Sequence, residues 1–260
     1  MAENLRSYLA FATETAYLAG QLTLGYFQTG ILPEFKGDDT PVTVADKKCE
    51  AFIRSRIEAT YPSHAILGEE YGNSNEGASH RWVIDPIDGT KSFMRGVPLY
   101  GVLLGLEIEG RVDVGVAHFP AMGEMLAAAD GQGCWWNGKP ARVSQATDLS
   151  RAYLGCTDPG IFGRYNRTAE WDRLQKAVYY RVGWSDCYGQ LLVATGRLDI
   201  MLEPVMAPWD CGPFPVIFRE AGGYFGDWRG NETIFGNEAV STSQTLLPQV
   251  LAILNGDAAA

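Results

Sequence analysis

The sequence predicts a mixed α/β protein, and three features of its pattern carry this prediction. Two stretches before residue 60 have apolar residues at helical spacing, whereas residues 100–143 alternate as successive β-strands do. After residue 143, helices and short strands follow one another. A chain of 260 residues, 46% of them hydrophobic, can bury a substantial core, and no linker divides it. We therefore expect a single domain over residues 1–260.

The first two elements are expected to be amphipathic helices. In the N-terminal one, apolar residues recur at helical spacing between polar ones: Leu5, Tyr8, Leu9, Ala12, Ala16 and Ala19. The second should begin near Lys47, and its inner face consists of Cys49, Phe52, Ile53 and Ile57. Asp46 precedes that face, where a carboxylate can cap the free amides of a helix start.

Short strands are expected near Ala65 and Trp82, and a strand-rich region follows. Its strands should cover residues 101–107, 112–119 and 124–129, and Asn137-Gly138 predicts a hairpin turn. The pair Gly131-x-Gly133 lacks the third glycine and the following helix of a dinucleotide site. A Rossmann-type cofactor site is therefore excluded.

The most informative segment is Asp85-Pro86-Ile87-Asp88-Gly89-Thr90, which follows the apolar run Trp82-Val83-Ile84. Because Pro86 cannot donate to a sheet ladder, the strand should end near Asp85. The turn brings Asp88 back toward Asp85, and Gly89 lets the backbone approach a ligand closely. Two carboxylates beside free amides suit Mg²⁺ and phosphate. The same residues also fit an ordinary strand-to-helix turn with Asp88 as N-cap.

Two more acids stand in comparable places. Glu69 follows the apolar run Ala65-Ile66-Leu67, so a second strand should deliver a carboxylate to its end. Asp210 precedes the apolar residues 214–218 at an expected helix start. Taken alone, each acid also fits an ordinary structural role, Glu69 as a surface residue and Asp210 as an N-cap. With Asp85 and Asp88 they complete an oxygen-ligand set for a metal.

These motifs resemble the inositol monophosphatase superfamily of Mg²⁺-dependent, lithium-sensitive phosphatases. Their order and spacing agree along nearly the whole chain, in the following pieces: residues 39–46, 61–64, 68–70, 85–90, 131–133 with 137–138, 192–196, 209–210 and 220–223. The resemblance implies a layered αβαβα sandwich and a homodimer.

By the same resemblance, the metal ligands are Glu69, Asp85, the main-chain oxygen of Ile87, Asp88 and Asp210. The amides of Gly89 and Thr90 would hold the phosphate. Glu69 and Thr90 would orient the attacking water, with Asp46 holding the threonine hydroxyl. Lys36 could help to attract phosphate, although it also fits an ordinary surface cation.

Substrate choice is expected to lie beyond the metals. Trp184-Ser185-Asp186-Cys187-Tyr188 places an acid where inositol phosphatases usually carry small residues, which looks more like the histidinol-phosphate phosphatases of the superfamily. An ammonium-bearing substrate would gain a charge-assisted hydrogen bond from Asp186, and Glu203 would be a second such group. The alternative is that Asp186 only caps or pairs within a buried turn.

Composition excludes several other classes of function. The net charge of −10 argues against nucleic acid as a partner. No apolar run reaches the roughly 20 residues that span a bilayer, and the N-terminus lacks the pattern of a secretory signal. Five scattered cysteines form neither a disulfide framework nor a zinc motif, which fits the reducing cytoplasm.

The sequence thus predicts a cytoplasmic Mg²⁺-dependent phosphomonoesterase that acts on L-histidinol phosphate, a small-molecule phosphate monoester. One alternative is an inositol-1-phosphate phosphatase of broad specificity, which is favoured if Asp186 faces away from the site. Another is a metal- or phosphate-binding protein without turnover. The intact set of acids counts against that last alternative.

Overall fold

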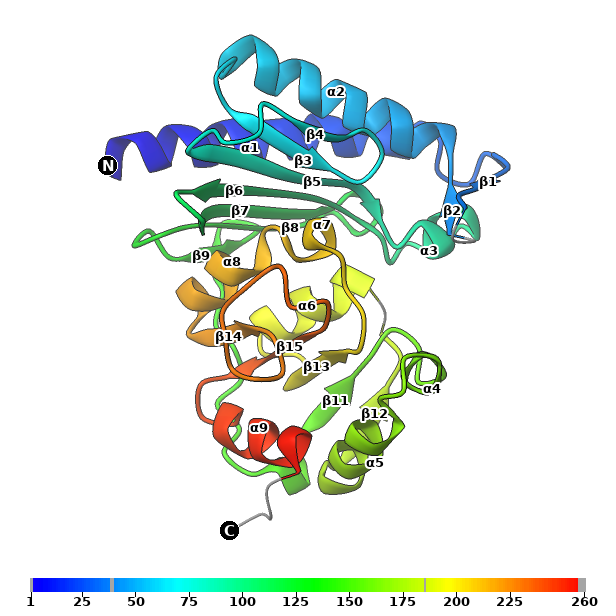
Figure 1. The fold of residues 1–260 in the computed structure, drawn as a ribbon, viewed down its shortest axis with the longest axis vertical. Coiled ribbons are helices and arrows are strands. Elements are labelled where there is room, and N and C mark those ends of the chain that lie inside the picture. Colours follow the sequence, from blue (N-terminus) through cyan, green and yellow to red (C-terminus); the bar gives the residue numbers. More distant parts are fainter. Residues whose placement is uncertain (1, 38–39, 185, 257–260) are drawn as a thin grey trace.

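Helices and sheets alternate in five layers, αβαβα, in the computed structural model, which describes residues 2–37, 40–184 and 186–256 (Figure 1). Asp39 and Ser185, which belong to motifs discussed above, lie outside the described residues. The layered α/β sandwich expected from the sequence is confirmed. Within the described ranges, none of the helices is both long and apolar enough to cross a membrane.

The first layer consists of α1 (Ala2–Leu24) and α2 (Val44–Thr60), which cover the outer face of a large sheet (Figure 1). Both expected helices are confirmed, but α2 begins at Val44 and not near Lys47. Thr43 is its N-cap and Asp46 stands at the third helical position, where the two side chains form a capping box. Asp46 is therefore part of the cap without being the N-cap residue.

The second layer is an eight-stranded sheet in the order β10-β9-β8-β7-β6-β5-β3-β4. Its strands are β3 (Ala65–Gly68), β4 (Gly72–Ser74), β5 (His80–Asp88), β6 (Gly101–Ile108), β7 (Arg111–Phe119), β8 (Glu124–Ala129), β9 (Cys134–Trp136) and β10 (Lys139–Pro140). β3 and β5 are parallel, and the other neighbours are antiparallel. The expected strands and the Asn137-Gly138 hairpin are confirmed.

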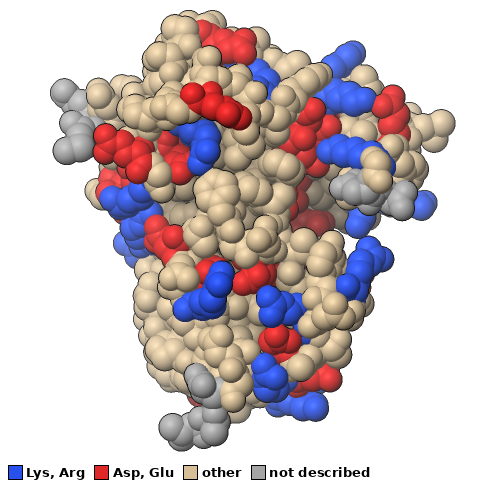
Figure 2. All heavy atoms as spheres, viewed as in Figure 1, with Lys and Arg blue, Asp and Glu red and all other residues tan. Residues whose placement is uncertain are grey.

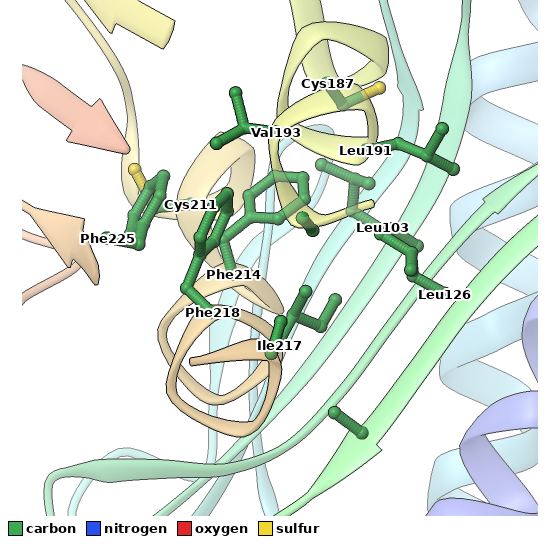
Figure 3. Packing of buried hydrophobic residues seen from close by; sticks show 14 of the residues in the cluster. Leu103, Leu126, Cys187, Leu191, Val193, Cys211, Phe214, Ile217, Phe218 and Phe225 are labelled. Carbon is green, nitrogen blue, oxygen red and sulfur yellow. The ribbon is translucent and has the colours of Figure 1, made fainter. Parts of the chain in front are cut away.

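A middle layer of two helices separates this sheet from a second one. α6 (Asp186–Ala194) and α8 (Phe214–Ala221) lie there, preceded on the α8 side by the short helix α7 (Pro208–Cys211). Figure 3 shows Phe214, Ile217 and Phe218 of α8 packing with Leu191 of α6 and Leu103 of the large sheet. Because this apolar cluster contacts both sheets, it fixes where the starts of α6 and α7 lie.

The second sheet has five strands in the order β12-β11-β13-β15-β14. They are β11 (Tyr153–Gly155), β12 (Tyr180–Val182), β13 (Ile200–Glu203), β14 (Gly223–Gly226) and β15 (Ala239–Ser243). Its outer face is covered by α5 (Thr168–Ala177) and α9 (Leu247–Asn255), with α4 (Ile161–Arg164) beside them. A two-stranded ribbon of β1 (Glu34–Phe35) and β2 (Pro41–Val42) lies near α3 (Thr90–Met94), at one end of the large sheet (Figure 1).

Glycines let the α7–α8 connection approach the large sheet closely. A Cβ at Gly105 would lie 2.3 Å from the carbonyl oxygen of Gly212, and one at Gly115 would lie 2.3 Å from that of Pro213. Real Cβ atoms essentially never come so near, so both positions require glycine. This contact brings Asp210, two residues before Gly212, to the sheet.

Candidate metal and phosphate site

The first two carboxylates of the site lie at the end of β5. The expectation that Pro86 ends this strand is wrong, because β5 continues to Asp88. Asp85 pairs with Leu103 and Asp88 with Gly101, so three steps along β5 match two along β6. The extra residue is a β-bulge, and a proline is tolerated there because its missing N–H is not needed.

Gly89 forms the turn from β5 into α3. It is the N-cap of the helix with φ of 87°, so the alternative in which Asp88 is the N-cap is wrong. A side chain would meet the carbonyl oxygen of Leu99 at 2.9 Å and Asp186 Oδ2 at 3.2 Å. Glycine is therefore required by both the backbone conformation and the space.

Asp210 brings a third carboxylate to the same place. Asp85, Asp88 and Asp210 each offer an oxygen atom, and these atoms lie within 4.8 Å of one another. Asp210 stands at the third position of α7, and its Oδ2 accepts the Ala207 amide at 2.8 Å. The expectation of a helix start is confirmed, although Asp210 is not the N-cap. Three carboxylate oxygens at such distances could hold a hard cation.

The pKa values of the carboxylates in this cluster also indicate a site for a cation. Burial, together with the neighbouring acids, raises the pKa of Asp85 and of Asp88 well above the usual range for aspartate. Burial also raises the pKa of Asp210 to about 6. Carboxylates crowded away from water are costly unless a cation compensates them. The donor set therefore fits a divalent ion.

Glu69 lies next to this cluster, directly after β3. Its pKa rises to about 7, chiefly through burial, while Lys36 opposes the rise. The Lys36 ammonium lies 2.8 Å from Glu69 Oε1 and 2.8 Å from Glu70 Oε1. The charge of Glu69 acts on Asp85, and that of Asp210 acts on Glu69. Lys36 is thus paired with Glu69 and is not an isolated surface cation.

Thr90 and Asp46 meet as the sequence led us to expect. The Thr90 hydroxyl lies 3.2 Å from Asp46 Oδ1 and 3.1 Å from the carbonyl oxygen of Ile87. The other oxygen of Asp46 accepts the Thr43 amide at 2.8 Å in the capping box. Asp46 therefore serves the helix cap and Thr90 at once, with one oxygen for each.

Asp186 and Glu203 belong to one hydrogen-bonded chain that reaches the cluster of carboxylates at Asp88. The Thr157 amide and hydroxyl donate to Glu203 Oε1, each at 2.7 Å, and Thr157 Oγ1 accepts the Asp186 amide at 2.9 Å. The next amide, of Cys187, donates to Asp88 Oδ2 at 2.7 Å. Asp186 is the first residue of α6, with φ of 51°, and its Oδ2 faces Gly89. The two expected substrate-binding acids are thus brought to one side of the cluster.

The surface reflects this arrangement. Figure 2 shows acidic side chains gathered in a hollow at the right of the molecule, with basic side chains at its rim. The upper side of this hollow is formed by the large sheet, near the ends of β3 and β5 (Figures 1 and 2). Its lower side is formed near the start of α6.

Two residues at the site were missed by reasoning from sequence, namely Glu50 and Thr157. Glu50 lies fully buried on α2 beneath the Glu69 turn, next to the inner-face residues Cys49 and Ile53. An acid beside the apolar face of an amphipathic helix was the available signal. For Thr157, which stands in a loop after β11, the sequence offers no comparable signal.

A cluster of carboxylates at the end of a bulged strand, in a five-layered αβαβα fold, is typical of one class of phosphatase. Residues 4–256 match the inositol monophosphatase family, and the chain belongs to this family of phosphatases. Members of this family depend on a metal ion, and the acids described above could hold one.

Individual relatives carry different names. The histidinol-phosphatase of Chlorobaculum parvum is 41% identical over 252 residues, covering 96% of this chain and 97% of the relative. Inositol monophosphatase 3 of Solanum lycopersicum is 36% identical, covering 89% and 91%. The solved structure of an inositol monophosphatase from Anabaena has a TM-score of 0.85 and 29% identity, covering 97% of each chain.

Proposed function

We propose that this chain is a Mg²⁺-dependent phosphomonoesterase that hydrolyses L-histidinol phosphate to L-histidinol and phosphate, in histidine biosynthesis. The observation that carries the choice of substrate is the position of Asp186. Its carboxylate faces the Gly89 turn beside the metal cluster, where the leaving group of a bound phosphate ester would lie. The histidinol-phosphatase relative at 41% identity supports the same choice.

The proposed metal ligands are Glu69, Asp85, the main-chain oxygen of Ile87, Asp88 and Asp210. All are oxygen donors, as Mg²⁺ prefers. A bound ion would polarise the phosphoryl oxygens and lower the pKa of a bound water. The bulge in β5 supports this assignment because it places Asp85 and Asp88 within reach of Asp210.

The proposed catalytic residues orient the attacking water and the phosphate. Glu69 and Thr90 would accept hydrogen bonds from the water, with Asp46 fixing the Thr90 hydroxyl. The amides of Gly89 and Thr90 would bind phosphoryl oxygens, since the first amides of a helix have no partner inside the helix. With the water positioned and the charge of the phosphate compensated in this way, hydrolysis would need no covalent phosphoenzyme intermediate.

Asp186 and Glu203 would recognise the cationic part of the substrate. Burial raises the pKa of Glu203 to about 8, and the nearby charge of Asp186 contributes to the rise. An ammonium group bound there would compensate both acids, and a neutral polyol would not. This difference is what would separate histidinol phosphate from inositol phosphate.

The test is phosphate release from histidinol phosphate and from inositol-1-phosphate, side by side, with Mg²⁺ and with EDTA. We expect Mg²⁺-dependent turnover and a higher kcat/KM for histidinol phosphate. A preference for inositol-1-phosphate would instead support the second candidate, an inositol-phosphate phosphatase, which the relative in Solanum lycopersicum favours. Activity on neither ester would contradict both.

A further inference from the structure

The turn that carries Glu69 rests on a buried ion pair from α2. Glu50 is 0% exposed, and its Oε1 accepts a hydrogen bond from Arg54 Nε at 2.7 Å. Both residues face the segment between β3 and β4, which contains Glu69. A carboxylate in such a place must be satisfied by donors, and the donors to Glu50 among the described residues lie on this turn or on Arg54.

The contacts of Glu50 enclose Glu69 from both sides. Glu50 Oε2 accepts the Glu70 amide at 2.7 Å, and Oε1 accepts the Tyr71 amide at 3.2 Å. On the other side, a Cβ at Gly68 would lie 2.1 Å from Glu50 Oε1. The backbone before Glu69 thus lies against the same carboxylate that binds the two amides after it.

Arg54 fixes the end of the turn. Its Nη2 donates to the carbonyl oxygen of Gly72, the first residue of β4. The backbone of Glu69 itself donates to the carbonyl oxygen of Ile84 at 3.3 Å, which ties the turn to β5. The pairing of Gly68 with Gly72 between β3 and β4 closes this turn, and the ion pair on α2 and the bond to β5 hold it in place.

We propose that Glu50, supported by Arg54, is a positioning residue that keeps the Glu69 carboxylate within reach of Asp85 and Asp210. The inference rests on the proposed role of Glu69 as a metal ligand. Glu50 is buried beside the apolar inner face of α2, where a hydrophobic residue would pack without the desolvation of a charge. A glutamate is explained at this position because its carboxylate accepts hydrogen bonds from two backbone amides and from the Arg54 guanidinium at the same time, which only an anionic acceptor can do.

Glu50→Gln is the direct test, because glutamine keeps the size of the side chain. Its single carbonyl oxygen can accept the Glu70 amide, but its NH₂ group cannot accept from Tyr71 or Arg54. We expect Mg²⁺ to bind the metal-free protein at least tenfold more weakly by titration calorimetry. The Mg²⁺ concentration for half-maximal activity should rise by the same factor, while KM for the phosphate ester at saturating Mg²⁺ stays within about twofold.

Glu107→Gln is the matched control. Glu107 is a buried acid on β6 of the large sheet, 6% exposed, whose Oε2 accepts a hydrogen bond from Arg81 Nε at 2.8 Å. It pairs with Arg81 near the start of β5, away from Asp85 and Asp88 at the end of that strand. This variant should lose thermal stability without any change in Mg²⁺ affinity. Equal Mg²⁺ affinities for Glu50→Gln and Glu107→Gln would overturn the inference.

A double-mutant cycle of Glu50→Gln and Glu69→Gln distinguishes failure of this inference from failure of the proposed function. If Glu50 acts through Glu69, the double variant should bind Mg²⁺ no more weakly than Glu69→Gln alone. Unchanged Mg²⁺ affinity in Glu69→Gln would contradict the ligand assignment itself. Weaker binding in Glu69→Gln with normal binding in Glu50→Gln would overturn only the role of Glu50.

Arg54→Lys tests the same inference if Glu50→Gln does not fold. Lysine keeps the charge beside Glu50 but cannot reach Glu50 and the Gly72 carbonyl with a rigid fork of donors. We expect a smaller loss of Mg²⁺ affinity, about threefold to tenfold, in a folded protein. Wild-type affinity in folded Arg54→Lys would contradict the inference.

Discussion

Asp85 shows, at the scale of a single residue, why the site demands a cation. The residue is 1% exposed, and one of its oxygens accepts the Ile87 amide at 3.0 Å. Burial first, and the charges of Glu69 and Asp88 next, raise the pKa of Asp85 in the metal-free protein. A divalent ion would reverse this balance and favour the ionised carboxylate.

Asp85→Asn should therefore abolish turnover. The amide keeps the shape of the side chain but removes the charge that a metal ion requires. We expect kcat/KM to fall by more than about 100-fold, since loss of even an outer-shell partner of a metal ligand costs about 10–100-fold. Calorimetric titration with Mg²⁺ should show weakened binding, and unchanged circular dichroism would serve as the control for folding.

Asp186→Ala should separate hydrolysis from substrate recognition. Turnover of a generic aryl phosphate should be spared, whereas kcat/KM for histidinol phosphate should fall by the equivalent of about 1.5–3 kcal/mol, the value of a hydrogen bond to a charged group. Kinetics on the two esters with one protein preparation provide the comparison. Equal losses on both would show that Asp186 supports the turn and does not bind the substrate amine.

Glu203 should make the metal-free protein less stable as the pH rises from acidic values toward 8. Its folded pKa is about 8, raised mainly by burial from an ordinary value of 4.5. Between these pH values the unfolded chain has released a proton that the folded protein keeps, so folding stability falls as pH rises from 4.5 to 8. Denaturant unfolding of wild type and Glu203→Gln across this range should show a shallower decline for the variant. Parallel curves would contradict the prediction.

At the scale of elements, the site exists because three chain segments with different constraints meet. A bulge in β5 aims Asp85 and Asp88, the turn after β3 presents Glu69, and α7 is pressed against the sheet through Gly105 and Gly115. Each segment is held by neighbouring parts of the chain: β5 by its register with β6, the Glu69 turn by Glu50 and Arg54, and the end of α7 by its contact with the sheet. The proposed ligand set would therefore be preorganised before a metal binds.

Gly105→Ala tests this preorganisation. The new Cβ would start 2.3 Å from the Gly212 carbonyl oxygen, so α7 or β6 must move. We expect a loss of about 1–3 kcal/mol in the free energy of unfolding, as overpacking of a core usually produces. Mg²⁺ affinity should fall as well, because Asp210 moves with α7. A destabilised variant with normal Mg²⁺ affinity would show that Asp210 tolerates the shift.

At the scale of the whole molecule, the middle helices join the two sheets. The apolar cluster of α6 and α8 reaches Leu103 and Leu126 on one sheet and Phe225 on the other (Figure 3). Met201 of the second sheet belongs to the same cluster. The two sheets thus share this central cluster, while separate apolar clusters cover the outer faces of the two sheets. The shared cluster supports the proposal that residues 1–260 form a single domain.

A single cooperative unfolding transition follows from that proposal. Scanning calorimetry and denaturant unfolding followed by circular dichroism and tryptophan fluorescence should report the same midpoint. Two separated transitions would show that the sheets unfold independently. Light scattering on the same samples tests the homodimer expected from the family resemblance, for which we expect twice the chain mass of 28.4 kDa.

Much of the site could be predicted from the sequence because its acids follow apolar runs. Glu69 and Asp85 stand directly after such runs, and Asp210 stands at a helix start. The path of β5 through Pro86 could not be predicted, because a bulge depends on the register with β6. Nor could Glu50 be assigned a role, since its partners are amides about twenty residues away.

The sequence by itself determined the mixed α/β class, the family and the identity of the acids, because apolar periodicity and short motifs are local properties. Only the tertiary structure decided which of those acids share one site and which neighbours hold them. Asp186 beside Gly89, Thr157 between Asp186 and Glu203, and Glu50 beneath Glu69 are contacts between segments far apart in the chain. The first two arise from the packing of the two sheets around the middle helices, and the third arises from the packing of α2 on the large sheet, which no local pattern encodes.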